Sequence, residues 1–218
     1  TAWYHGDRLE LWVGAQAPGL ARAAAARAIG ISPEAVILHP TLIGGSFGAA
    51  LECDAAAQAA ILTVKAKRPV QLTWSQREAL ARDRVRAPAK ARMTARLAAN
   101  GAILGWRAQI AAPATGRDLA ARLMPDDWLI EAALALPRAA DGYAVAGAVP
   151  PYRLPGCIVE HHPAGIGVPT GHLRGGAHGY TCFFTECFLD ELAHQAGMEP
   201  VSWRIGMLGG DARLARCL

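Results

Sequence analysis

"LIGGSFGAALECD" (residues 42–54) follows an apolar, β-branched run and precedes an alanine-rich segment. It therefore places a glycine loop between a strand expected over 35–43 and a helix expected from about 50 to 67, with Asp54 near the start of that helix. Glycines there let the backbone approach a ligand closely and leave amide N–H groups free for an anion or for oxo groups. Taken alone, the loop leaves open the alternative of a tight turn with Phe47 packed into the core.

The segments around this loop continue the alternation of strand and helix. Residues 8–13 alternate like a strand and lead into an alanine-rich helix that Gly30 ends. Residues 70–74 predict a further strand. Ser75 follows as an N-cap, with Glu78 three residues later in the pattern of a capping box.

The second half of the chain begins with the strongest short-range signal, a hairpin at Asn100-Gly101. Residues 113–150 lose strong periodicity and are expected to form a surface excursion with a helix near 126–136. A strand is expected over 156–163, followed by a long Gly/Pro loop over 164–179. The predicted fold class is α+β (mixed α/β), with a mixed sheet, packed helices and an antiparallel hairpin.

Two helices are expected to close the chain. The first covers residues 181–197 and ends at Gly197, and the second begins after Glu199-Pro200. The apolar face predicted for the first comprises Phe184, Cys187, Phe188, Leu192 and Ala196.

Composition excludes several classes of protein. No run of the 218 residues approaches the roughly 20 apolar residues of a membrane span. The chain starts at Thr1 without a signal sequence and is expected to be a piece of a longer protein. The net charge of +4 is spread out, and its densest stretch, 77–96, lacks interleaved stacking aromatics, so a solvated surface is expected rather than a nucleic-acid site.

The cysteines and the paired histidines do not predict a metal site. The five cysteines form no CxxC pair and are odd in number, so they are expected to be small buried hydrophobes in a reducing compartment. His161 and His162 are adjacent on a predicted strand and point to opposite faces.

Two further stretches suit an anionic ligand. Arg174 lies in "HLRGGAHG" (172–179), a glycine-rich loop ahead of a helix, where free amides and a planar guanidinium favour phosphate-like oxygens. Gln16 lies just beyond the end of the strand over 8–13, where its amide can donate to a ligand. An ordinary exposed loop is the alternative for each.

The order of these features along the chain resembles that of a known family. The features are, in order, Trp12, "AQAP", "GGSFG", the hairpin, "HLRGGAHG" and "FFTECFLDELAHQAGMEPVSWRIGML". The family is the molybdopterin-binding subunit of the xanthine dehydrogenase and aldehyde oxidase superfamily. The chain is most similar to the isoquinoline 1-oxidoreductase β-subunit type of bacterial molybdenum hydroxylases.

The resemblance implies roles for particular residues. Backbone amides at Phe47 and Gly48 would lie close to the molybdenum and its pterin, and Gln16 would donate to a metal oxo group. It implies no protein ligand to the metal and no catalytic residue in this chain, because the family's catalytic glutamate lies in a later domain. The implied cofactor-binding residues are Gln16, Gly44, Gly45, Ser46, Phe47, Gly48, Arg174, Gly175 and Gly176.

The chain departs from the family pattern directly after the glycine loop. Positions 49–51 read Ala-Ala-Leu, where relatives of the isoquinoline type tend to carry arginines and purine-oxidising relatives a lysine and a substrate-orienting glutamate. Glu52 is one position away from that glutamate and is not assigned its role. A purine substrate is therefore disfavoured.

As a whole, the resemblance implies that residues 1–218 form the first molybdopterin-binding domain of a larger subunit, without its N-terminal hammerhead-type domain and its second cofactor domain. The parent would hydroxylate an aldehyde or an N-heteroaromatic carbon with oxygen derived from water, using a molybdopterin cofactor in its cytosine dinucleotide form and a 2Fe-2S partner. The isolated chain is expected to be inactive and without cofactor. The alternative is a non-catalytic ligand-binding or assembly module, and the compartment stays open between the cytoplasm and an exported or membrane-associated location.

Overall fold

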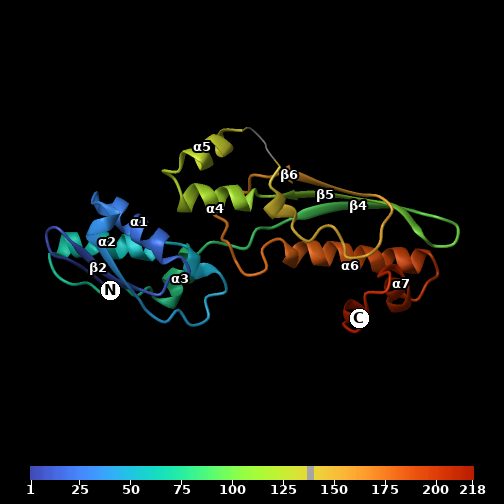
Figure 1. Cartoon of the computed structure of the whole chain (residues 1–218), viewed down its shortest axis with the longest axis horizontal. Coiled ribbons are helices and arrows are strands. Elements are labelled where there is room, and N and C mark those ends of the chain that lie inside the picture. The colour runs from blue at the N-terminus through green and yellow to red at the C-terminus, as the bar shows by residue number, and fades with distance from the viewer. Residues whose placement is uncertain (137–139) are drawn as a thin grey trace. The chain divides into compact units, whose positions relative to one another are not determined.

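Two three-stranded sheets, each with helices on one face, make up the structure, a computed structural model that describes residues 1–136 and 140–218 (Figure 1). The chain forms two compact units. The first contains residues 1–86, 117–136 and 169–174, and the second contains residues 87–116, 137–168 and 175–218. The α+β class predicted from the sequence is confirmed.

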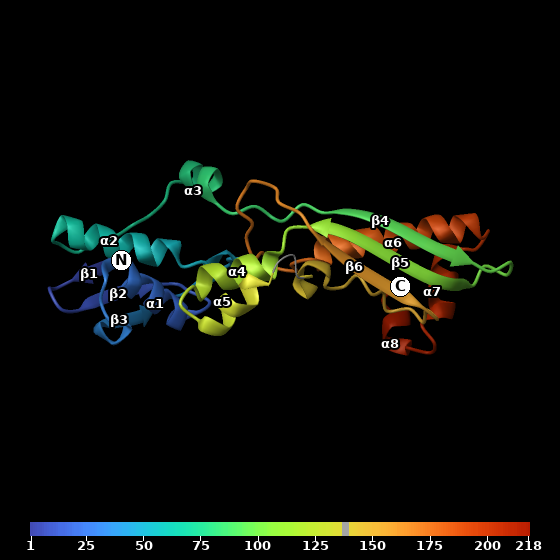
Figure 2. The same ribbon diagram turned by 90° about the horizontal axis from the view of Figure 1, so that it is seen from above.

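The first unit is built on the sheet β1-β2-β3, in which β2 pairs antiparallel with β1 and parallel with β3 (Figure 2). Helix α1 connects the two parallel strands and ends at Gly30, whose φ of 71° is left-handed, as the sequence predicted. The main elements that lie wholly or mostly in this unit are β1 (Ala2–Tyr4), β2 (Leu9–Val13), α1 (Pro18–Ile29), β3 (Val36–Pro40), α2 (Asp54–Ala66), α3 (Gln76–Arg82), α4 (Thr115–Leu123) and α5 (Trp128–Ala135).

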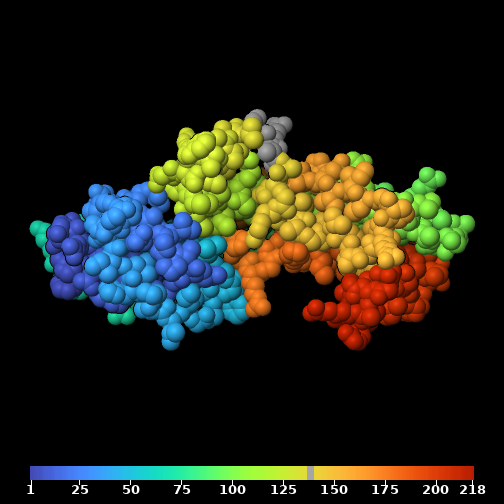
Figure 3. Space-filling view, in the orientation of Figure 1, coloured from blue at the N-terminus to red at the C-terminus, as the bar shows by residue number. Residues whose placement is uncertain are grey.

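The core of the first unit explains its alanine content. Alanines on α1 and α2 are buried against Leu9 and Leu11 of β2 and Val36 of β3. Side chains this small let two helices approach one sheet face and each other closely. The space-filling view shows α1 in blue beside the yellow-green α4–α5 segment, where Arg27 pairs with Asp126 at 2.6 Å (Figure 3).

The first unit differs from the sequence prediction at two element boundaries and at one predicted strand. Strand β3 ends at Pro40 instead of residue 43, and α2 begins at Asp54 instead of about residue 50, because a 3-10 turn occupies Ala49–Leu51. Residues 70–74 form no strand. Val70 makes an isolated bridge to Ala2, so the pairing stops after one residue.

The second unit is built on the sheet β4-β5-β6, in which β5 pairs antiparallel with β4 and parallel with β6. The predicted hairpin at Asn100-Gly101 joins β4 to β5, with a register shift between Arg96 and Leu97. The main elements of this unit are β4 (Lys90–Leu97), β5 (Ile103–Ala112), β6 (Cys157–Pro163), α6 (His178–Gln195), α7 (Pro200–Met207) and α8 (Ala212–Ala215).

The buried face of α6 only partly matches the one expected from the sequence, since Leu192 is buried and Phe188 packs against the core. Cys187 is exposed, whereas Thr181 and Thr185 are buried. Their hydroxyls donate to the carbonyl oxygens of Ala177 (3.0 Å) and Thr181 (2.9 Å), so these polar side chains are satisfied inside the core. The whole buried face is Thr181, Thr185, Leu189, Leu192 and Ala193.

The cysteines also differ from expectation. All five are free, but none is fully buried. Cys53 and Cys157 are half-buried, and burial raises the pKa of both thiols. The three exposed cysteines are Cys182, Cys187 and Cys217. Across the described residues, no helix has the length and apolar character needed to cross a membrane.

An ion cluster joins α6 to α7. The Arg204 side chain is 7% exposed, and it pairs with Glu186 at 2.9 Å and with Asp190 at 2.7 Å. Tyr152 donates to the same Glu186 carboxylate at 3.1 Å. Burial, reinforced by the negative charge of Glu186, raises the pKa of Tyr152 to about 12.

This raised pKa predicts a loss of stability at alkaline pH. The neutral phenol is favoured in the folded protein, so its contribution is complete below pH ~10 and is lost as the pH rises toward 12. Absorbance titration of the wild type and of Tyr152→Phe isolates this phenol by difference. We expect a midpoint near 12, and a midpoint near 10 would show that the cluster does not protect it.

Candidate functional site

The glycine loop after β3 has an unusual backbone. Gly44 and Gly48 have φ values of 65° and 100°, and Phe47, which carries a side chain, has a φ of 50°. A bulky residue in the left-handed region is an outlier that the surroundings must stabilise. The Phe47 side chain is 68% exposed, so the alternative in which it packs into the core is wrong.

The loop presents unpaired backbone donors. Its turn is closed by Ala49 N–H to the Ser46 carbonyl (2.9 Å) and by Leu51 N–H to the Gly48 carbonyl (3.1 Å). The amides of residues 45–48 donate to no acceptor in the described part of the chain. Four consecutive free N–H groups form a concentration of positive dipole that suits an anionic ligand.

The loop that carries Arg174 lies directly against the glycine loop. Arg174 N–H donates to the Phe47 carbonyl at 2.6 Å. A Cβ on Gly48 would overlap the carbonyl oxygen of His172 and would lie 3.2 Å from the Cα of Leu173. Gly48 is therefore a position where a close approach of two backbones requires glycine.

Gln16 contacts the glycine loop through both its backbone and its side chain. Its backbone N–H donates to the Ala50 carbonyl at 3.0 Å, and its side-chain oxygen accepts from the Ser46 hydroxyl at 3.1 Å. The exposed side-chain NH₂ of Gln16 has no acceptor among the described residues. Gln16, Ser46, Phe47, Gly48 and Arg174, which are distant in the sequence, thus meet at one place that we call the cradle.

The remaining expected site residues take different places. Gly44 and Gly45 belong to the same loop, and a Cβ on Gly45 would meet only the Phe47 ring, at 3.6 Å. Gly175 and Gly176 follow Arg174 in the second unit and have φ values of 86° and 48°. Both adopt the left-handed backbone that glycine favours.

An ion network that no sequence pattern indicated lies beside the cradle. Glu52 is 15% exposed and lies between two guanidinium groups, Arg122 at 2.6 Å and Arg84 at 3.2 Å. Arg84 also pairs with Asp54 at 3.1 Å. Arg84 stands in the basic stretch that was expected to be solvated, yet its side chain is only 21% exposed. Glu52 is thus held by protein cations on both carboxylate oxygens.

The cradle consists mainly of hydrogen-bond donors. It offers backbone amides, the amide of Gln16 and the exposed guanidinium of Arg174, and residues 44–51 contain no acidic side chain. In the described part of the chain, no group of three or more His, Cys, Asp and Glu side chains could hold a metal ion. The donors therefore fit a ligand with several anionic oxygens better than a bare cation.

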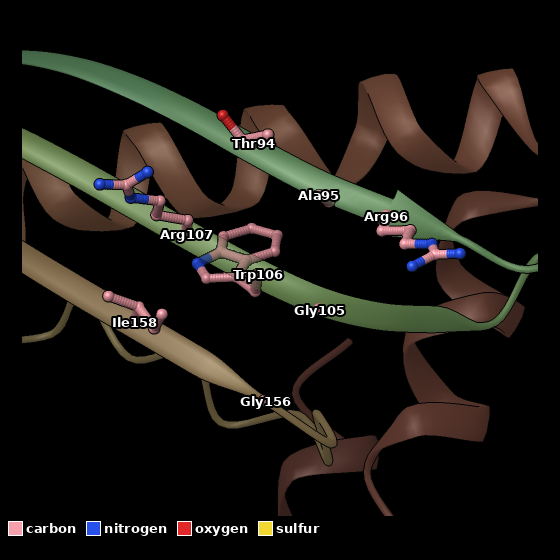
Figure 4. A pocket seen from close by; sticks show the side chains of 8 residues that line it. All are labelled: Thr94, Ala95, Arg96, Gly105, Trp106, Arg107, Gly156 and Ile158. Carbon is pink, nitrogen blue, oxygen red and sulfur yellow. The ribbon is translucent and has the colours of Figure 1, made fainter.

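A separate hollow of about 320 Å³ lies on the sheet of the second unit, around Trp106 and Arg107 (Figure 4). Its walls are mostly apolar, and it contains none of the expected site residues. The indole N–H of Trp106 is buried without an acceptor among the described residues, and the indole ring packs against Phe188 of α6.

Comparison with known proteins identifies relatives over nearly the whole chain. The sequence profile of the family described as molybdopterin cofactor-binding domain matches residues 1–124. Isoquinoline 1-oxidoreductase subunit beta of Brevundimonas diminuta is 28% identical over 205 residues, which are 94% of this chain and 25% of the relative. A membrane-bound aldehyde dehydrogenase [pyrroloquinoline-quinone] of Gluconacetobacter polyoxogenes is 28% identical over 94% of this chain and 26% of its own length.

A solved structure shares the fold. Aldehyde oxidoreductase from Desulfovibrio gigas superposes with a TM-score of 0.69 at 19% identity, covering 93% of this chain and 21% of that protein. The chain thus spans about a quarter of the length of the curated relatives that it matches.

The backbone geometry at Gly48 predicts a sharp difference between two glycines of one loop. Gly48→Ala places a Cβ against the His172 carbonyl at a positive φ, and we expect it to cost about 3 kcal/mol of unfolding free energy. Gly45→Ala has room and serves as the matched control, with an expected cost below about 1 kcal/mol. Chemical denaturation measures both, and equal costs would contradict the close approach of the loops.

Proposed function

The chain belongs to the molybdopterin cofactor-binding domain family, and from this premise we propose that the cradle binds the anionic, oxygen-rich part of a molybdopterin cofactor. The donor set carries the proposal. Free amides over residues 45–48 lie in a loop that contacts the Gln16 side chain and the backbone of Arg174, and residues 44–51 carry no competing carboxylate. A buried anionic group needs such donors to replace its water.

Each cradle residue has a distinct part in this proposal. The amides of Phe47 and Gly48 hold ligand oxygens, and the glycines keep side chains out of the way. Gln16 donates a hydrogen bond to an oxo group, while Ser46 fixes its orientation through the 3.1 Å bond. The Arg174 guanidinium balances negative charge, and Gly175 and Gly176 continue that loop. The bound cofactor supplies the two-electron redox chemistry, and the chain supplies its binding and orientation.

We further infer that residues 1–218 serve as the first cofactor-binding domain of a larger molybdenum-dependent oxidoreductase. The names of the relatives support an N-heteroaromatic or aldehyde substrate. We propose that this substrate is hydroxylated with oxygen derived from water. In the same proposal the cofactor is in its cytosine dinucleotide form, and a 2Fe-2S subunit or domain receives the electrons. The family's catalytic glutamate would lie outside this chain.

The ion network bears on substrate choice. Arg84 and Arg122 form ion pairs with the two carboxylate oxygens of Glu52. The Glu52 side chain therefore stabilises the fold and is not available to a substrate. Ala49, Ala50 and Leu51 carry no polar side chain that could orient a purine. Both observations favour a less polar substrate over a purine.

Metal and pterin analysis of the purified full-length protein tests the proposal. We expect molybdenum and pterin in the wild type, a severe loss of both in Gly48→Val, and near-normal content in Phe47→Leu, because the Phe47 amide and not its ring is the donor. Gly45→Ala is the matched control.

Three outcomes would contradict this proposal. A stable wild type without molybdenum and pterin would favour a non-catalytic binding or assembly module, and a quinone in their place would favour a different cofactor. Normal molybdenum content in Gly48→Val would show that the loop is only a turn.

A further inference from the structure

Residues 84–86, which we call the strap, contact the loop that carries Arg174 (the second loop) and the segment that follows the glycine loop (the first loop). They lie within the basic stretch between α3 and β4, for which sequence analysis gave no specific role. Each of the three residues makes a different contact, and all of these contacts lie within the first unit.

Val85 joins the strap to the second loop through the backbone. Its N–H donates to the Pro169 carbonyl at 3.0 Å, and its carbonyl accepts from Gly171 N–H at 2.9 Å. A Cβ on Gly171 would lie only 2.9 Å from the Cβ of Arg84, so the two segments are in close contact. The start of the second loop is thereby fixed on the strap.

Arg84 joins the strap to the chain that follows the first loop. Its guanidinium lies 3.2 Å from Glu52 and 3.1 Å from Asp54, at the beginning of α2. Arg122 of α4 holds the same Glu52 from the other side. This contact is partly buried, and its loss would affect the fold as well as the cradle.

Arg86 acts on the cradle more directly. Its Nη2 donates to the Arg174 carbonyl at 3.1 Å, and Arg174 N–H donates in turn to the Phe47 carbonyl at 2.6 Å. Arg174 is thus held on both sides, by Arg86 and by Phe47. Arg86 is otherwise exposed, and its remaining N–H groups have no acceptor in the described part of the chain.

We propose that Arg86 is a positioning residue of the cofactor site. It holds the Arg174 carbonyl, keeps Arg174 N–H on the Phe47 carbonyl, and so preserves the contact between the two loops beside the free amides of residues 45–48. Because Arg86 is exposed, this role concerns ligand retention and not the stability of the empty fold. The inference rests on the proposed function of the cradle.

The test compares Arg86→Met, which keeps the aliphatic stem without a donor, with Arg86→Lys, which keeps a charged donor. Arg82→Met is the matched control, since Arg82 is 73% exposed and its nearest acidic partner, Glu78, is 3.9 Å away. The readouts are the molybdenum-to-protein ratio of the full-length protein, its decline during repeated buffer exchange, and the thermal midpoint of cofactor-free protein.

We expect Arg86→Met to lose molybdenum about tenfold faster than the wild type, as expected for one charged hydrogen bond, while the midpoint of cofactor-free protein is unchanged. Arg86→Lys is expected to stay within about twofold of the wild type, and Arg82→Met to match it. Wild-type retention in Arg86→Met, or equal loss in Arg86→Met and Arg86→Lys, would overturn the role of Arg86. Absence of molybdenum from the wild type would instead refute the proposed function.

Discussion

The hydrogen bond from Arg174 N–H to the Phe47 carbonyl is the interaction on which the cradle depends. It joins two loops separated by more than a hundred residues, and it requires Gly48 because a side chain there would meet the opposite backbone. With the Phe47 carbonyl engaged and its φ at 50°, the neighbouring amides are left without protein acceptors. The proposed function assigns these donors to an anionic ligand.

Charged and neutral groups have different roles in and around the cradle. Arginine and carboxylate side chains pair with each other around Glu52 and anchor the surrounding segments, whereas the proposed ligand-binding positions offer backbone amides and one glutamine. Backbone donors have fixed positions and lose no side-chain entropy on binding. A large anionic cofactor that must be held in one orientation benefits from both properties.

Much of this arrangement could be predicted from the sequence, because glycine, proline and capping residues act locally. The strand before the glycine loop, the Ser75 cap, the hairpin at Asn100-Gly101 and the helix end at Gly197 all follow from such signals. Contacts between residues that are distant in the sequence produce weaker patterns in the sequence. Neither the strap contacts nor the Glu52 network has a periodic pattern. Thr181 and Thr185 were missed as buried residues of α6 because the carbonyl oxygens of Ala146, Ala177 and Thr181 satisfy their hydroxyls.

The most direct test of the central claim is an anomalous difference map recorded at the molybdenum absorption edge from crystals of the full-length protein. The account predicts a molybdenum peak beside the cradle, with the amides of Phe47 and Gly48 and the side chain of Gln16 turned toward the cofactor. A molybdenum peak elsewhere in the protein, with the amides of residues 45–48 facing only water, would contradict it.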